Sequence, residues 1–263
     1  MKQSKQLIKV KLISTKYLDN FSKSLTDDLE ILFEKIPTSH IEFPDFNFYV
    51  AGAATYSSNI EGNTVSFETF LKHRRFGGIG KGKELQEIEN LISAYEFAQS
   101  NKLTLENFLE SHKILSKNIL IKSKQGKIRD EKVGVFGERG LVYLAIEPEI
   151  VEEEIEKLFS DISELNNEEL SVNEIFYFAS MIHLVFVKIH PFMDGNGRAA
   201  RLLEKWFLAE KLGAKAWNIE SEKMYFKNRK TYYDNVHIGV NYHELNYEKC
   251  LPFLLMLPES LKQ

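Results

Sequence analysis

Apolar residues along this chain recur every three or four positions, which places them on one face of a helix. A different pattern in residues 133–136 and 141–146, two apolar segments around Gly137 to Gly140, predicts a β-hairpin. We therefore expect a mainly α fold with one small β-hairpin. The spacing predicts helices over residues 17–36, 46–60, 84–99, 104–117, 149–165, 172–188 and 198–212, and a short helix from about residue 66.

The most apolar of these segments is the predicted helix 172–188. Ser171 and Glu174 have the spacing of a capping box at its start, and Pro191 disfavours helical backbone at His190 after its end. Its apolar run is about half the length that a membrane span needs. We therefore expect a buried core helix and no membrane association.

Composition narrows the class of protein. The chain has 263 residues, of which 43% are apolar, so it can bury a substantial core. Its net charge of −4 disfavours a nucleic-acid-binding surface. A single cysteine, Cys250, excludes an internal disulfide and fits a reducing compartment. Residues 2–16 lack the uninterrupted apolar core of a signal peptide. We expect a cytoplasmic protein without nucleic-acid partners.

The candidate chemistry lies between two long, mostly apolar predicted helices, 172–188 and 198–212, in the segment His-Pro-Phe-Met-Asp-Gly-Asn-Gly-Arg-Ala-Ala-Arg of residues 190–201. Gly195 and Gly197 let a ligand approach the backbone closely, and the helix that starts there directs free N–H groups at an anion. Arg198 and Arg201 are three residues apart and so share one helical face. This arrangement predicts a phosphate site.

Two further side chains suggest what happens at that site. Asp194 would repel a bare phosphate but would hold Mg²⁺, which takes carboxylate and phosphate oxygens together. His190 carries a group suited to proton transfer near neutral pH. Taken singly, these features have simpler interpretations: a structural histidine, a glycine turn and a surface pair of Asp194 with Arg198. Their coincidence in one short segment favours a magnesium–phosphate site beside a base.

Residues 190–201 match the Fic-domain motif H-x-F-x-[D/E]-G-N-G-R-x-x-R at every fixed position, so the chain resembles the Fic family. The stretch from Gly126 to Arg129 and the following hairpin resemble the family's flap. Tyr232-Tyr233, Asn241 and Pro252-Phe253 resemble its C-terminal signature. The resemblance covers about residues 46–257. It implies a Fic-type helical bundle with the hairpin beside the active site, divided into an N-terminal helical extension (1–45), an inhibitory helix (46–63) and a Fic core (64–263).

The resemblance implies a protein adenylyltransferase, which transfers AMP from ATP to a Ser, Thr or Tyr hydroxyl of a target protein. The target is not visible in the sequence, and the acceptors allowed include the protein itself. ATP is the substrate and Mg²⁺ the cofactor. The implied roles are general base for His190, Mg²⁺ ligand for Asp194, loop anchor for Phe192, phosphate cradle for Gly195, Asn196 and Gly197, β-phosphate contact for Arg198, γ-phosphate contact for Arg201, and adenosine contacts for Asn241 and Tyr233.

The end of the predicted helix 46–60 resembles the family's inhibitory motif, [S/T]-x-x-x-E-[G/N], in Ser57, Glu61 and Gly62. The resemblance implies that Glu61 pairs with Arg201. One guanidinium cannot give its paired donors to both a carboxylate and a γ-phosphate. Glu61 alone would otherwise be interpreted as a solvated carboxylate at a helix end.

Several alternatives stay open at this point. Relatives transfer UMP, phosphocholine or phosphate, or remove AMP; Gly197 favours AMP over phosphate transfer, because the phosphate-transferring branch carries Lys there. A nucleotide-sensing module with little catalysis is the other alternative, against which His190 argues. The stretch Gly77 to Glu84 approaches a P-loop but has Glu84 at the Ser/Thr position and follows a predicted helix, so we expect a loop. The oligomeric state is open, and an oligomer is compatible with the sequence.

Overall fold

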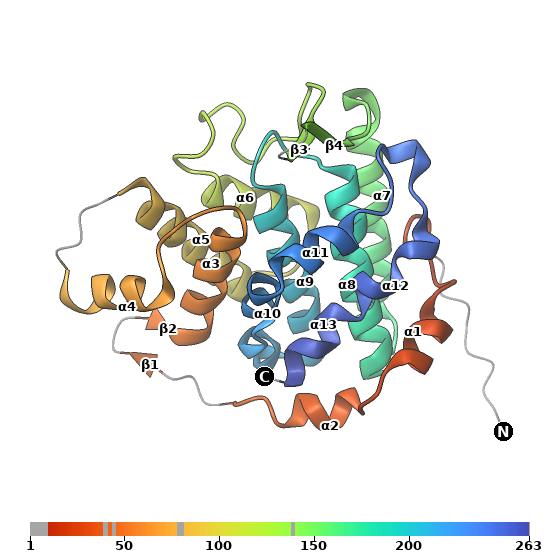
Figure 1. Ribbon diagram of the computed structural model, residues 1–263, viewed down its shortest axis with the longest axis horizontal. Coiled ribbons are helices and arrows are strands. Elements are labelled where there is room, and N and C mark those ends of the chain that lie inside the picture. Colours follow the sequence, from red (N-terminus) through yellow and green to blue (C-terminus); the bar gives the residue numbers. More distant parts are fainter. Residues whose placement is uncertain (1–9, 39–41, 44–45, 78–81, 138–139, 263) are drawn as a thin grey trace.

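Two long helices, α8 and α9, pack against each other at the centre of the protein, and the other helices surround them (Figure 1). The computed structural model describes residues 10–38, 42–43, 46–77, 82–137 and 140–262. The predicted mainly α fold with a small antiparallel hairpin is confirmed. The α-helices are α1 (Leu18–Ser24), α2 (Leu29–Glu34), α3 (Phe48–Ile60), α4 (Phe67–Phe76), α5 (Lys83–Ser100), α6 (Leu105–Leu115), α7 (Pro148–Asn167), α8 (Val172–Ile189), α9 (Asn196–Leu212), α10 (Ser221–Lys227), α11 (Arg229–Val236), α12 (Leu251–Leu254) and α13 (Met256–Glu259).

Helix α8 is the core helix that the sequence predicts. The capping box between Ser171 and Glu174 is formed at its start, with both the side-chain and the backbone bond present. Among the described residues it is the one helix long and apolar enough to cross a membrane, and 83% of it is buried inside the protein. Its side chains face α7, α9 and α12, so the apolar surface is covered by other helices.

The predicted helix 17–36 is wrong as a single element, because the chain forms α1 and α2 with a break between them. Asp28 explains the break, since its carboxylate accepts from the backbone N–H groups of Glu30 and Ile31 and so caps the start of α2. Before α1, the carboxylate of Asp161 on α7 accepts from the backbone of Lys11, Leu12 and Ile13. The N-terminal segment is thus fixed to the helical core.

Helix α3 runs through the protein interior, and most of its residues are buried. Its small side chains allow close contact with α5 and α10 on either side. It begins at the N-cap Asn47, preceded by a short antiparallel pair, β1 (Glu42–Phe43) with β2 (Phe46–Asn47), that the sequence does not predict. The domain boundaries at residues 45 and 63 stay predictions.

The hairpin pairs β3 (Gly134–Gly137) with β4 (Gly140–Leu144) beside the C-terminal end of α8 (Figure 1). An irregularity between Val135 and Phe136 shifts the register. The hydroxyl of Tyr143, which is buried, donates to the carbonyl of Lys188 on α8 and so ties the hairpin to the core. Four apolar side chains of the hairpin point into solvent: Phe136, Leu141, Val142 and Leu144.

The segment with P-loop-like spacing joins two helices. Helix α4 ends at its C-cap Gly77, whose φ of 65° suits glycine, and α5 begins at Lys83. The element directly before the segment is helix α4 and not a strand, which fits the rejection of a P-loop. Residues 78–81, on which the predicted loop falls, lie outside the described residues.

Short 3-10 helices span Ala214–Asn218, Tyr242–Glu244, Tyr247–Lys249 and Ser260–Lys262.

Candidate active site

The turn at His190 leaves this side chain ready to accept a proton. His190 follows α8 as its C-cap with left-handed backbone (φ 54°, ψ 59°), which is uncommon outside glycine, and Pro191 prevents the helix from continuing. Its Nδ1 lies 3.2 Å from the carbonyl oxygen of Val187, so Nδ1 carries the proton and Nε2 is the unprotonated nitrogen. Burial lowers the pKa of His190 to about 4, and the ring is neutral at pH 7.

Arg129 fixes the backbone of this turn. Its side chain is 2% exposed, and its Nε donates to the carbonyl of His190 at 2.8 Å. Its backbone N–H donates to the carbonyl of Pro191 at 2.9 Å. The sequence marks Arg129 only as the end of the segment that resembles the flap; the structure shows that it connects this segment to the loop at residues 190–201.

The middle of the loop is closed by its own residues. Phe192 is buried against Phe108 and Phe186, as expected for an anchor. The Asn196 side chain accepts from the backbone N–H of Phe192 at 2.9 Å and donates to its carbonyl at 2.8 Å. Asn196 thus uses its side-chain amide to close the loop, while its backbone N–H belongs to the first turn of α9.

The N-terminus of α9 has the features of an anion site. Gly195 is its N-cap in left-handed conformation (φ 83°), and no side chain caps the helix there. The N–H groups of the first turn therefore have no side-chain acceptor, and the helix dipole directs positive potential at the same place. This is the position that the sequence predicts for phosphates.

Arg201 is fully buried and directly contacts the segment that resembles the family's inhibitory motif. Its Nη2 donates to Glu61 Oε1 at 2.7 Å and to the carbonyl of Ser57 at 3.0 Å, while its Nε donates to Ser57 Oγ at 2.8 Å. The hydroxyl of Tyr232 accepts from Nη1 at 3.3 Å. The pairing of Glu61 with Arg201 that the resemblance implies is therefore present in the structure.

The carboxylate of Glu61 also lies against the first turn of α9. A Cβ atom added at Gly197 would overlap Glu61 Oε1, so this glycine leaves the space that the carboxylate fills. Burial opposes the charge of Glu61, but Arg201 and Arg198 together hold its pKa below the ordinary value. Glu61 is thus an anion bound at the site predicted for a phosphate.

Asp194 and Arg198 form the outer part of the site. The Asp194 side chain is 55% exposed, and its Oδ1 accepts from Arg198 Nη2 at 3.3 Å and from the backbone N–H of Gly195 at 2.5 Å. Within the described residues there is no cluster of three or more His, Cys, Asp or Glu that could hold a metal ion. A single exposed carboxylate suits Mg²⁺ only together with phosphate oxygens and water, so the donor set fits the predicted role.

The two residues predicted near adenosine lie apart from each other. The hydroxyl of Tyr233 donates to the carbonyl of Ile60 at 3.0 Å, which puts it at the end of α3 beside Glu61. Asn241 forms a bridge to Leu144 at the end of the hairpin, and its side chain caps the 3-10 helix that follows. The structure places Tyr233 beside Glu61 and Asn241 at the end of the hairpin, and the adenosine contacts of both stay predictions.

Two buried histidines on α6 and α8 make polar contacts behind the site. His112 stacks on Phe192 at 3.5 Å; its Nε2 contacts the carbonyl of Asp194, and its Nδ1 accepts from the backbone N–H of Gly126. His183 connects Tyr232 to the buried Glu204. In the sequence, the only signal for these two histidines is their position in apolar helical segments, which does not reveal their hydrogen bonds.

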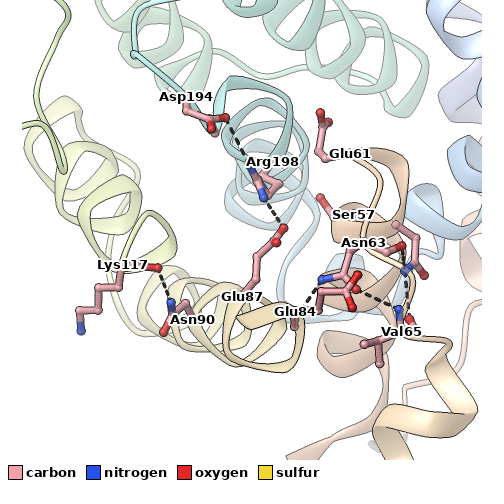
Figure 2. Close-up of polar contacts among 12 residues, drawn as sticks. Ser57, Glu61, Asn63, Val65, Glu84, Glu87, Asn90, Lys117, Asp194 and Arg198 are labelled. Atoms are coloured by element: carbon pink, nitrogen blue, oxygen red, sulfur yellow. Dashed lines mark hydrogen bonds and ion pairs between the residues drawn. The ribbon is translucent and has the colours of Figure 1, made fainter. Parts of the chain in front are cut away.

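A contact to the site that the sequence does not reveal comes from α5. Glu87 forms an ion pair with Arg198 Nη1 (Figure 2). Nothing in the sequence distinguishes Glu87 from the other glutamates of the segment, because its contact depends on how α5 packs beside α9.

Comparison with known proteins agrees with this geometry. The model of the Fic/DOC family matches residues 102–208. Over 154 residues the chain is 30% identical to protein adenylyltransferase fic-1 of Caenorhabditis briggsae. The aligned region covers 55% of this chain and 29% of that relative. The chain thus spans less than a third of the curated relative's length.

Solved structures share the fold. A Fic family protein from Desulfovibrio desulfuricans superposes with a TM-score of 0.73 at 21% identity, covering 95% of this chain and 73% of that one. A Fic domain containing signaling protein from Bacteroides thetaiotaomicron gives a TM-score of 0.66 at 20% identity, covering 92% and 95%. The helical bundle, the loop at residues 190–201 and the family match agree: the chain carries a domain of the Fic/DOC family.

Proposed function

We propose that this protein is an adenylyltransferase that transfers AMP from ATP to a hydroxyl side chain of a target protein, and that Glu61 holds this activity low. The observation that carries the proposal is the loop itself. It combines an uncapped helix N-terminus at Gly195 with a neutral histidine, His190, whose Nε2 is free to accept a proton. Such a loop binds a polyphosphate and activates a hydroxyl in one place.

The residues divide the work in the following way. The backbone N–H groups at the start of α9 bind the phosphates, and Arg198 and Arg201 supply charged donors to the β- and γ-phosphates. Asp194 is the residue that would hold Mg²⁺, which neutralises phosphate charge when bound. The target hydroxyl gives its proton to His190 Nε2, and its oxygen attacks the α-phosphorus. The bond from that phosphorus to the bridging oxygen breaks, and pyrophosphate leaves.

The hairpin suits the recognition of the target. Phe136, Leu141, Val142 and Leu144 are exposed on β3 and β4 although they are apolar. An extended peptide that adds to the hairpin through main-chain bonds would cover these side chains and would leave its sequence loosely specified. The target hydroxyl would come from such a segment or from another copy of this protein.

Labelling with ATP tests the proposal. Incubation of the Glu61→Gly protein with ATP labelled at the α-phosphate and Mg²⁺ should label the protein itself or proteins of a lysate, and mass spectrometry should find AMP on Ser, Thr or Tyr. The double variant Glu61→Gly/His190→Ala should lose the labelling while it keeps ATP binding. Label from the γ-phosphate instead, or equal labelling without His190, would contradict the proposal.

A further inference from the structure

Helix α5 contributes a carboxylate to the site from outside the loop at residues 190–201. Glu87 reaches Arg198 Nη1, and both side chains are largely buried, with 17% and 8% exposure (Figure 2). The pair therefore differs from solvent-exposed ion pairs, which contribute little because water screens them.

Arg198 has two acidic partners, and they are not equivalent. Asp194 is 55% exposed, lies 3.3 Å from Nη2 and also accepts from the backbone of Gly195. In the proposed function Asp194 turns to Mg²⁺, so its contact with Arg198 is given up when nucleotide binds. Glu87 has no such second task, and it then remains as the fixed partner of Arg198.

The part of α5 that carries Glu87 is held on both sides. One turn earlier, the Glu84 carboxylate accepts from the backbone N–H and hydroxyl of Thr64, and its carbonyl accepts from Asn63. One turn later, Asn90 donates to the carbonyl of Lys117 at 2.6 Å. In Figure 2 Glu87 points from α5 to Arg198, while Glu84 and Asn90 contact the neighbouring segments before and after it. Hydrogen bonds on both sides of Glu87 thus hold this part of α5 in place.

Glu87 does not fill the phosphate position. The three atoms nearest to a Cβ added at Gly197 belong to Glu61 and Arg201, and none of the three belongs to Glu87. Meanwhile Arg198 Nε is buried and has no hydrogen-bond partner among the described residues. With Nη1 fixed by Glu87, Arg198 keeps Nη2 and Nε as donors for an anion.

We propose that Glu87 is a positioning residue for nucleotide binding, which fixes the Arg198 guanidinium so that its free donors meet the β-phosphate. This inference rests on the proposed function. A hydrogen bond between a charged donor and a buried acceptor, such as that of Arg198 with Glu87, is strong enough that its loss changes the affinity for nucleotide by about tenfold or more. Glutamine at position 87 keeps an acceptor for Nη1, whereas alanine removes it.

The test uses the Glu61→Gly protein as the parent, so that Arg201 is free in every variant. Glu87→Ala, Glu87→Gln and the control Glu89→Gln are compared for the Kd of Mg²⁺–ATP by calorimetry and for KM and kcat of labelling. Glu89 lies on the same helix as Glu87 but pairs with Arg74 of α4. Urea unfolding of each variant checks that it is folded.

Glu87→Ala should raise Kd and KM for ATP about tenfold with kcat changed less than about threefold. Glu87→Gln should recover most of the affinity, and Glu89→Gln should match the parent. Unchanged or tighter ATP binding by Glu87→Ala, or an equal loss in Glu89→Gln, would overturn the inference. If the parent binds ATP but does not label protein, the proposed function fails while the binding data still decide the role of Glu87. If the parent binds no ATP, both fail.

Discussion

Arg201 donates to Glu61 Oε1 at 2.7 Å from a fully buried position, and the same carboxylate lies where a Cβ of Gly197 would be. One acidic side chain thus uses a donor of the arginine predicted to bind the γ-phosphate and fills space at the start of α9. Burial opposes the charge on Arg201, but Tyr232 and Glu61 raise its pKa above the ordinary value, so the guanidinium stays charged.

Glu61→Gly should raise labelling from ATP about tenfold or more over the wild-type chain, because the buried Arg201 can then give to a phosphate the charged donor that it gives to Glu61 in the wild type. Glu61→Gln serves as the matched variant. It keeps an acceptor for Arg201 without the charge, so its labelling should lie between the two. Equal labelling by wild type and Glu61→Gly would show that the ion pair is not inhibitory.

Gly197→Ala tests whether a phosphate and Glu61 share the same space. In the Glu61→Gly background the new methyl group projects into the volume that the carboxylate leaves. We expect the Kd of ATP to rise about tenfold, since the methyl group keeps a phosphate away from the first turn of α9. Gly52→Ala is the control, because its Cβ would meet the Phe67 ring at an ordinary 3.6 Å. Similar ATP affinity in both variants would separate the two sites.

The sequence predicts most of this site because its chemistry lies in one contiguous segment. Residues 190–201 hold the predicted base, the acidic residue, the glycines and both arginines, and the helix ending at Glu61 carries a motif of its own. Contacts made by packing are different. Glu87 reaches Arg198 only because α5 lies beside α9, and no local pattern encodes that contact.

The differences between the predicted and the observed elements also come from features that apolar spacing does not show. Apolar spacing runs without interruption through residues 17–36, yet the Asp28 side chain competes for backbone N–H groups and starts a new helix. The pair β1–β2 has two residues in each strand, too few for an alternating pattern to show. Helix α8, with a capping box and a long apolar run, agrees with its prediction to within one residue at its end.

Tyr232→Phe tests the buried chain of hydrogen bonds behind Arg201. The Tyr232 hydroxyl contacts Arg201 Nη1 at 3.3 Å and His183 Nε2 at 2.9 Å, and His183 Nδ1 contacts Glu204 at 2.7 Å. Removing the hydroxyl leaves a buried ring nitrogen without its partner, which costs about 1–3 kcal/mol of unfolding free energy. Urea unfolding measures this.

The control for that measurement is Tyr56→Phe. The Tyr56 ring packs against Phe67 and Phe226, and these contacts survive the loss of the hydroxyl. Its unfolding free energy should stay within about 0.5 kcal/mol of wild type. If both variants lose the same stability, the Tyr232 hydroxyl has no special part in holding Arg201.

The stability of the protein should depend on pH through His112. Burial lowers the pKa of this ring from 6.5 to about 4 in the folded protein, where its Nδ1 accepts a bond from Gly126 that a protonated ring could not accept. Between these values the unfolded chain binds a proton that the folded protein does not, so stability is lost as the pH falls below 6.5. From the size of the shift, this loss is about 2–3 kcal/mol at about pH 4.5.

His112→Gln isolates this effect. The variant should be less stable than wild type at pH 7, since it loses the stacking on Phe192, but its unfolding free energy should fall less steeply between about pH 7 and pH 4.5. Urea unfolding at several pH values gives both curves, and the contribution of His190 is common to them and cancels in the difference. Parallel curves would mean that His112 takes up a proton as readily in the folded protein as in the unfolded chain, and that the bond from Gly126 does not keep the ring neutral.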